Sequence, residues 1–329
     1  MNRRDGGVVI KKIYLKLLLT TFFWGGTFVA ARIAVREAPP FTAATVRFLI
    51  AGAVLVALAV RQARQEGSPL PLPKTIGQTA LLFSLGLTGV FLYTACFFTG
   101  LKLTTATNGS LIVAINPLIT AVISAKWLGE RVTRPQTAGL LISVAGVAVI
   151  ISKGSLAVIS GLSLNPGDLF MLGAPLCWAL YSVLGKKALA NFAPLTATAY
   201  AAVFGAACLL PAAIAESIHL GKGLPHFSAM GWLAELQLAL LGTVVGFVWW
   251  YQGIGVIGAS KAASFVNLVP LFGTVLAALI LSERITGAQL AGGGLVVLGV
   301  YLGSGQGFPA GKGVAVRLQP QPASREEEG

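Results

Sequence analysis

Long apolar runs follow one another along almost the whole chain, separated by short polar segments that often contain glycine or proline. Each run is apolar all round instead of along one face, which distinguishes it from the amphipathic helices of soluble proteins. A transmembrane helix needs about 20 apolar residues, whereas a membrane strand needs about 10. The pattern therefore predicts an all-α membrane protein. The ten helices it predicts span residues 13–33, 41–60, 77–100, 104–127, 136–152, 168–188, 195–215, 232–255, 259–282 and 287–304.

The composition agrees with this interpretation. Of the 329 residues, 55% are apolar and 11% are charged, against about 25% charged in a typical soluble domain. This excludes an ordinary soluble enzyme and a disordered chain. The two ends of the chain differ in composition from the apolar runs, as do the exposed connections at residues 61–75 and 216–230. Residues 1–12 are predicted to form a cytoplasmic N-terminal segment, and residues 306–329, rich in proline, glycine, glutamine and charge, a disordered cytoplasmic tail.

The net charge of +13 would suggest a nucleic-acid partner in a soluble protein, but membrane orientation explains it here. With the N-terminus in the cytoplasm, seventeen of the 24 lysines and arginines lie on the inner side, six lie on the outer side, and Arg47 lies inside a helix. Basic residues favour the cytoplasmic side of a membrane. We therefore expect a multi-pass protein of the cell (inner) membrane with both termini cytoplasmic, and no nucleic-acid partner.

The chain contains an internal repeat. Residues 117–139 read PLITAVISAKWLGERVTRPQTAG, and residues 270–292 read PLFGTVLAALILSERITGAQLAG, with matching positions 153 residues apart. A weaker match sets residues 22–34 beside residues 176–188 and aligns Trp24 with Trp178. Matches of this kind at a fixed offset indicate duplication of one structural unit.

The repeat predicts two copies of a five-helix unit, at residues 13–153 and 167–305. Because five is an odd number, equivalent points in the two copies must face opposite sides of the membrane. The two halves are then inverted relative to each other. Inverted repeats of transporters share a cavity near the middle of the membrane, and rocking of one half against the other opens it alternately to each side.

The tryptophan in the first helix of each copy, the proline followed by L-G/S-E-R at 128–131 and 281–284, and the Q-x-x-G after each resemble the EamA family of the drug/metabolite transporter superfamily. The resemblance covers both halves of the folded region. It implies ten helices, cytoplasmic termini, and export or exchange of small metabolites such as amino acids. These motifs do not indicate which cargo is carried.

Two prolines fall near the middle of the fourth and ninth predicted helices. Pro117 and Pro270 each remove a backbone hydrogen bond and should kink the helix, which makes them candidate hinges. Asn116 and Asn267 lie beside these kinks. Buried amides in a membrane must find partners. They either line a polar cavity that binds substrate or join helices by hydrogen bonds.

Two basic residues are further candidates for the cavity. Arg47 lies about 9 Å from the outer end of its helix at 1.5 Å per residue. Its side chain could reach the membrane surface or form a structural pair, or it could attract an anionic substrate. Lys261, near the inner end of the ninth helix, leaves the same alternatives open.

Aromatic residues could contact a planar or cationic cargo. The candidates are Trp24, Trp178, Tyr93 and Tyr251, the last of which follows Trp249 and Trp250. Membrane–water interfaces and helix packing also use such residues. Adjacent residues of a helix point to different faces, so the run from Trp249 to Tyr251 cannot all line one path.

Acidic residues give weaker signals. Glu130 and Glu283 each precede an arginine in a short turn, which favours local pairing or capping of the next helix over proton coupling. Asp168 opens the sixth helix and is predicted as its N-cap. Since no acidic residue falls in the middle of a predicted helix, we do not expect a carboxylate proton relay.

Together these features predict a transporter that moves small organic metabolites, amino-acid-like or drug-like, by alternating access, with export as the favoured direction. The alternatives are an uptake carrier or facilitator of the same fold, and a membrane scaffold that transports nothing. No predicted helix holds a histidine or a carboxylate cluster, so we expect no catalytic residue, metal or cofactor. The expected partners are a small-molecule substrate and the lipid bilayer. Coupling to a proton or another ion, and the choice between monomer and homodimer, stay open.

Overall fold

The computed structural model describes residues 3–162, 165–223, 225–281 and 284–305. Every regular element in these ranges is helical. The expected disordered tail at 306–329 and the turn residue Glu283 lie outside them. In chain order the elements are α1 (Arg3–Glu37), α2 (Pro40–Gln65), α3 (Ile76–Gly86), η1 (Leu87–Leu92), α4 (Tyr93–Leu103), α5 (Ala106–Ala114), α6 (Asn116–Leu128), α7 (Arg134–Ser152), α8 (Leu156–Ser160), α9 (Pro166–Ala188), α10 (Pro194–His219), α11 (Ala229–Leu236), η2 (Gln237–Val245), α12 (Gly246–Ile257), α13 (Ala259–Ser264), η3 (Phe265–Asn267), α14 (Leu268–Leu281) and α15 (Gly287–Gly303).

Nine helical segments of the described chain are long and apolar enough to cross a membrane. A further apolar helix, α15, has 17 residues, fewer than the about 20 that a bilayer requires. The all-α fold is therefore confirmed, whereas the count of ten crossings stays a prediction. The first helix begins ten residues before its predicted start, and the short helix α8 was not predicted.

The helices that contain Pro117 and Pro270 are interrupted just before each proline. In the fourth predicted helix, α5 ends at Ala114 and α6 begins at Asn116. In the ninth, a 3₁₀ turn over Phe265–Asn267 separates α13 from α14. Proline lacks the amide hydrogen that an α-helix needs and clashes with the carbonyl four residues earlier. The interruptions follow from this chemistry.

Two π-helical segments occur in matching places. η1 interrupts the third predicted helix between α3 and α4, and η2 interrupts the eighth between α11 and α12. Shifting η1 by the repeat offset of 153 places it within η2. Segments of this kind are rare and occur frequently at functional sites. Neither could be read from hydropathy, which is the same for α- and π-helical turns.

Glycines bring α7 and α15 into backbone contact. A Cβ built at Gly146 would lie 2.7 Å from the carbonyl oxygen of Gly292, and one built at Gly299 would lie 2.6 Å from that of Gly139. Residue numbers rise along one helix as they fall along the other, so the two helices run antiparallel. α2 and α10 are antiparallel as well, since Phe41 contacts Glu216 while Gly52 packs on Ala202.

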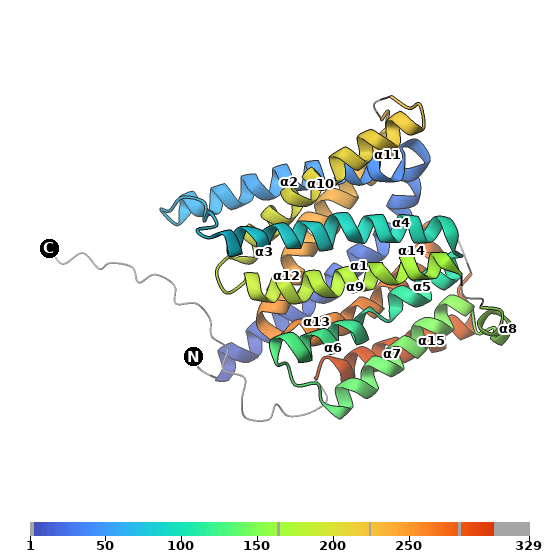
Figure 1. Ribbon diagram of the computed structural model, residues 1–329. Helices are drawn as coiled ribbons and strands as arrows, with labels where there is room; N and C mark the ends of the chain where they lie inside the picture. Colours follow the sequence, from blue (N-terminus) through green and yellow to red (C-terminus); the bar gives the residue numbers. More distant parts are fainter. Residues whose placement is uncertain (1–2, 163–164, 224, 282–283, 306–329) are drawn as a thin grey trace.

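The remaining long helices lie between these two pairs. Figure 1 shows α7 beside α15 along one edge of the bundle and α2 beside α10 along the opposite edge, with α1, α9 and α12 between them. Within this middle layer α1 packs on α12, and α9 packs on α4. The largest fully buried side chains include Trp250, Tyr181 and Tyr251, which belong to this layer.

Candidate functional site

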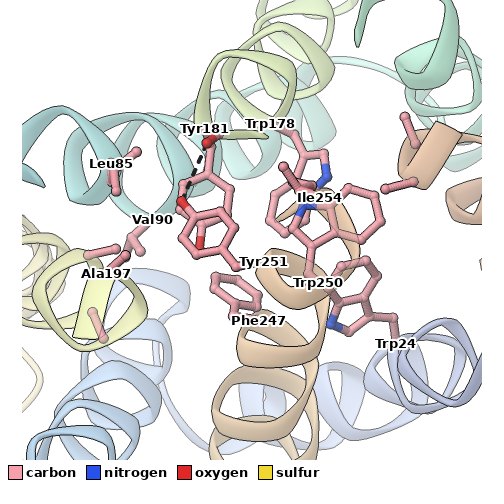
Figure 2. Close-up of a cluster of buried hydrophobic side chains, with 14 of the residues drawn as sticks. Trp24, Leu85, Val90, Trp178, Tyr181, Ala197, Phe247, Trp250, Tyr251 and Ile254 are labelled. Carbon is pink, nitrogen blue, oxygen red and sulfur yellow. Dashed lines mark hydrogen bonds between the residues drawn. The ribbon is translucent and has the colours of Figure 1, made fainter. Parts of the chain in front are cut away.

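A network of aromatic rings fills the centre of the middle layer (Figure 2). The rings of Trp24 (α1) and Trp178 (α9) meet edge to face, with 5.2 Å between centroids. Trp250 lies 5.4 Å from Trp24 and 5.8 Å from Trp178. Phe247 lies 5.3 Å from Trp178. Two helices that are equivalent in the sequence repeat thus place their tryptophans against each other and against α12.

The other predicted aromatic residues join this network. Tyr93, the first residue of α4, lies 5.8 Å from Trp178 between ring centroids. Tyr251 stacks on Tyr181 at 4.8 Å, and Tyr181 in turn lies 5.2 Å from Trp178. The structure therefore brings Trp24, Trp178, Tyr93 and Tyr251 into one continuous set of contacts. Contact between this aromatic network and the cargo stays a prediction.

Some polar atoms of the network are paired and others are not. Trp24 Nε1 donates a hydrogen bond to the carbonyl of Gly242 at 2.8 Å, and Trp250 Nε1 donates to Ser182 Oγ at 3.2 Å. The hydroxyl of Tyr251 donates to the carbonyl of Tyr181 at 3.4 Å (Figure 2). By contrast, Trp178 Nε1 and the Tyr181 hydroxyl are buried without a partner among the described residues. A buried donor without a partner is costly, and a bound molecule could supply one.

Arg47 points inward, toward η2, and not toward the membrane surface. Its Nε donates to Thr243 Oγ1 at 2.8 Å, and its guanidinium lies 5.0 Å from the ring centre of Phe48. Thr243 belongs to the π-helical segment η2, next to Gly242, which accepts the bond from Trp24. The structural pairing that the sequence left open is therefore present, and it lies beside the aromatic network.

Glu235 is a polar residue that the sequence analysis overlooked. It lies within the membrane-length helical segment Ala229–Ile257, its side chain is 0% exposed, and neither carboxylate oxygen has a hydrogen-bond partner among the described residues. Glu235 does not lie in the middle of a predicted helix, but the packing of the helices buries it all the same. Glu235 falls near the start of the predicted eighth helix, where a charged residue usually faces water. It lies in α11, which packs on α1, α2 and η2.

Asn116 and Asn267 are both 1% exposed and lie outside the aromatic network. Asn116 Nδ2 donates to the carbonyl of Pro175 in α9 at 2.9 Å, and Asn267 Nδ2 donates to Ser143 Oγ in α7 at 2.8 Å. This is the helix-joining geometry that the sequence left as one alternative. The side-chain oxygen of Asn267 is buried without a partner, so a role in binding stays a prediction for that residue.

Lys261 also lies apart from the network. It occupies the last turn of α13, and its half-buried side chain runs beside Gly305 at the end of the described chain. The hinge roles of Pro117 and Pro270 stay predictions as well.

Glu130 caps a helix of the other half of the chain. Its carboxylate accepts hydrogen bonds from the backbone amides of Ala259 and Ser260, each at 2.9 Å. Local pairing or capping of the next helix was predicted for Glu130, but Thr133 is the N-cap of α7. A carboxylate at a helix N-terminus satisfies amides that lack partners within the helix. Glu130 thus holds the turn at Gly258, whose φ of 89° favours glycine.

Asp168 supports a helix start in a different way from the one predicted. Asn165 is the N-cap of α9, and Asp168 is the third residue of a capping box whose carboxylate accepts the amide of Asn165 at 3.0 Å. The same carboxylate accepts a bond from the hydroxyl of Thr104, which ends α4. Asp168 therefore links the end of α4 to the start of α9.

Two open hollows lie on α2 near its C-terminal end. One of about 380 Å³ is formed between α2, the start of α10, η2 and α12, with Trp249 and Arg61 in its wall, and one of about 530 Å³ is lined by α2 alone. None of the predicted site residues lines either hollow. In this conformation the aromatic network is packed against itself. Among the described residues no group of three His, Cys, Asp or Glu side chains could hold a metal ion.

Comparison with known proteins gives the family. The sequence profile of the EamA-like transporter family matches the chain twice, at residues 11–152 and 165–305. The chain belongs to the EamA-like transporter family. With nine membrane-length helices in its described part, this EamA-like chain is a multi-pass membrane protein.

Several curated relatives carry transporter names. The chain is 35% identical to the uncharacterized transporter YyaM of Bacillus subtilis over 293 residues, covering 89% of this chain and 93% of the relative. It is 36% identical to an uncharacterized transporter of Archaeoglobus fulgidus, with coverage of 88% and 96%. It is 28% identical to a probable amino-acid metabolite efflux pump of Salmonella typhimurium, with coverage of 92% and 95%.

A solved crystal structure shares the fold. It superposes with a TM-score of 0.72 at 22% identity, covering 90% of this chain and 97% of the other. The EamA-like assignment and this structural likeness agree on the helical architecture.

Proposed function

We propose that the protein is a carrier that moves small organic metabolites, amino-acid-like or drug-like, across the cell (inner) membrane by alternating access, with export as the direction. The observation that carries this is the contact between Trp24 and Trp178 inside a network that buries two unpartnered donors. Aromatic faces with a few polar atoms are the usual lining of small-molecule sites. Opening of the bundle at this network would expose those donors to a cargo.

The proposed architecture is ten crossings built as two inverted five-helix repeats, at residues 13–153 and 167–305. Three observations support it. The family profile matches twice, over nearly these ranges. The last helices of the two copies, α7 and α15, run antiparallel through glycine contacts that exchange under the offset of 153. The π-helical segments η1 and η2 fall at corresponding places in the two copies.

Alternating access follows from this architecture. Two halves of opposite orientation are exchanged by a two-fold axis in the membrane plane, so the same contacts can close either end. The contact between Trp24 and Trp178, which the weaker sequence match aligns, supports such an axis between the two halves. Pro117 and Pro270 interrupt equivalent helices and are the proposed hinges.

Both termini are proposed to be cytoplasmic, on the strength of the seventeen basic residues that this orientation places inside. Export of amino-acid-like cargo is supported by relatives from Salmonella typhimurium and Escherichia coli that are named probable amino-acid metabolite efflux pumps. The relatives named only as transporters leave an uptake carrier or facilitator of the same fold as the second candidate.

The purified protein in liposomes tests the proposal. Vesicles loaded with a mixture of unlabelled amino acids, and separately with cationic drugs, are placed in dilute radiolabelled compound, and counterflow is measured with and without a proton gradient. Saturable counterflow of at least one compound, absent from empty liposomes, is the expected result. A broad panel in which nothing moves would contradict the proposal and favour a scaffold. With protein oriented inside-out, net accumulation in the vesicle lumen indicates export, whereas net efflux indicates uptake.

A further inference from the structure

Glu235 is a buried carboxyl group without hydrogen bonds, inside a membrane-length helical segment. Its side chain is 0% exposed, and both carboxylate oxygens lack a hydrogen-bond partner among the described residues. It is the seventh residue of the segment Ala229–Ile257, about 9 Å from the start of that segment at 1.5 Å per residue. No part of the proposed function requires a carboxyl group there.

The charged groups around Glu235 can be identified on each helix that packs against α11. From α2, Arg47 is the charged side chain that acts on Glu235, but its Nε is bonded to Thr243. From α1, Glu37 lies beside Gly231, one turn earlier, and is held by the amide and hydroxyl of Ser228. Arg32 and Arg36 of α1 are exposed.

Two further titratable or polar groups lie close to this region. Tyr93 of α4 interacts with Arg47 and not directly with Glu235. From η2, the amide of Gln237 donates to the carbonyl of Phe23 at 3.3 Å, and its side-chain oxygen has no partner. Neither Gln237 nor Arg47 donates a hydrogen bond to the Glu235 carboxyl group in this conformation.

An ionised carboxylate buried without hydrogen bonds is strongly disfavoured, whereas the neutral acid loses far less on leaving water. In the sealed conformation burial without hydrogen bonds therefore favours the protonated form of Glu235, against the attraction of Arg47. When helices separate and water reaches it, hydration and the nearby Arg47 both favour the ionised form. Two conformations that bind a proton with different affinities are linked to pH, because lower pH favours the conformation that binds it.

We propose that Glu235 is a proton-binding site of the transport cycle, which takes up one proton from water as the carrier seals and returns it to water as the carrier opens at the end where α2 and α11 begin. The proposal rests on the proposed function for the cycle itself. It adds that sealing consumes a proton, so that lower pH favours the sealed conformation.

Infrared spectroscopy of the purified full-length protein tests the protonation directly. At neutral pH the wild type should show the carbonyl band of a buried protonated carboxylic acid, and the band should be lost in Glu235→Gln. The variant Glu66→Gln removes an exposed carboxylate by the same chemical change, and it should keep the band. No such band in the wild type, or a band that survives in Glu235→Gln, would overturn the proposal.

Tryptophan fluorescence tests the link to conformation. As pH rises, the wild type and Glu66→Gln should show a one-proton change in emission as the buried tryptophans gain water, and Glu235→Gln should show an amplitude at least five-fold smaller. Glu235→Asp keeps an acid and should retain the change, which separates protonation from misfolding. Equal amplitudes in wild type and Glu235→Gln would refute the link. Neither measurement requires a cargo, so a carrier that fails the counterflow assay leaves these results interpretable.

Discussion

The indole rings of Trp24 and Trp178 meet edge to face, 5.2 Å apart between centroids, although 154 positions separate the two residues in the chain. The two are aligned by the weaker sequence match, so the contact joins corresponding points of the proposed repeats. Their environments nevertheless differ, because Trp24 Nε1 is hydrogen-bonded to Gly242 and Trp178 Nε1 has no partner. The two aligned tryptophans thus differ in their hydrogen bonding in this conformation.

This difference gives a matched pair of variants. Trp24→Phe removes a hydrogen bond worth about 1 kcal/mol, and it should lower the melting temperature in detergent by about 2 °C or more. Trp178→Phe removes a donor that has no partner and should change the melting temperature less. A thermal unfolding series followed by size-exclusion chromatography makes the comparison. Equal losses in the two variants would show that ring packing dominates.

The contact between α7 and α15 predicts a strong dependence on side-chain size. Gly292→Ala would place a methyl group 2.8 Å from the carbonyl oxygen of Gly146, and overpacking of this kind costs about 1–3 kcal/mol. Gly294→Ala, two residues away on the same helix, meets nothing within 4 Å. It should be neutral, or stabilising by up to about 1 kcal/mol. Folded yield and melting temperature are the readouts, and a tolerated Gly292→Ala would contradict the contact.

Glu130 should stabilise a helix far away in the chain. Glu130→Ala removes the acceptor for two amides at the start of α13, and loss of a helix cap costs about 0.5–2 kcal/mol. Glu130→Gln keeps one acceptor oxygen and should lose less. Limited proteolysis at the turn around Gly258 reports the local effect. If Glu130→Ala were protected as well as the wild type, the capping role would be wrong.

Asn267 and Ser143 share one hydrogen bond, which allows binding and packing to be separated. Both Asn267→Ala and Ser143→Ala remove the bond of 2.8 Å and should lower stability by a similar amount, about 1 kcal/mol. Because Asn267 also buries an unpartnered oxygen, we expect its variant to reduce counterflow about ten-fold more than Ser143→Ala does. Equal counterflow in the two variants would assign Asn267 to packing alone.

Cysteine labelling tests the inverted arrangement. In a variant with Cys96, Cys177 and Cys208 replaced by alanine, single cysteines are placed at the exposed positions Arg134 and Gly287, which begin α7 and α15. A membrane-impermeant maleimide added to intact cells should label Gly287→Cys at once and Arg134→Cys only after the membrane is permeabilised. Labelling of both from the same side would exclude inverted repeats.

The sequence predicts the all-helical membrane fold well because hydrophobicity and length alone decide it. It also locates the proline interruptions, since the missing amide acts locally. It could not reveal that Arg47 turns inward toward Thr243, or that Glu235 is buried, since both depend on which helices pack beside them. A charged residue near a predicted helix end looks the same in sequence whether water or protein covers it.

The distant partner of Glu130 was missed for a related reason. A carboxylate in a short turn can cap the helix that follows it or any helix start that folding brings near, and only the tertiary structure distinguishes these. The aromatic residues were chosen individually from repeat equivalence and composition. Their assembly into one network depends on the crossing of α1, α9 and α12, which no local pattern encodes.

The glycine contacts between α7 and α15 limit how the bundle can move. Backbones that already touch cannot approach further, and sliding by one residue would drive larger side chains such as Leu295 and Leu302 into the spaces that only glycines leave. We therefore expect α7 and α15 to move as one pair while other helices separate. Gating motions are then expected to rotate the other helices about the line where α7 meets α15. The largest displacement should fall on the opposite edge of the bundle, where α2 meets α10.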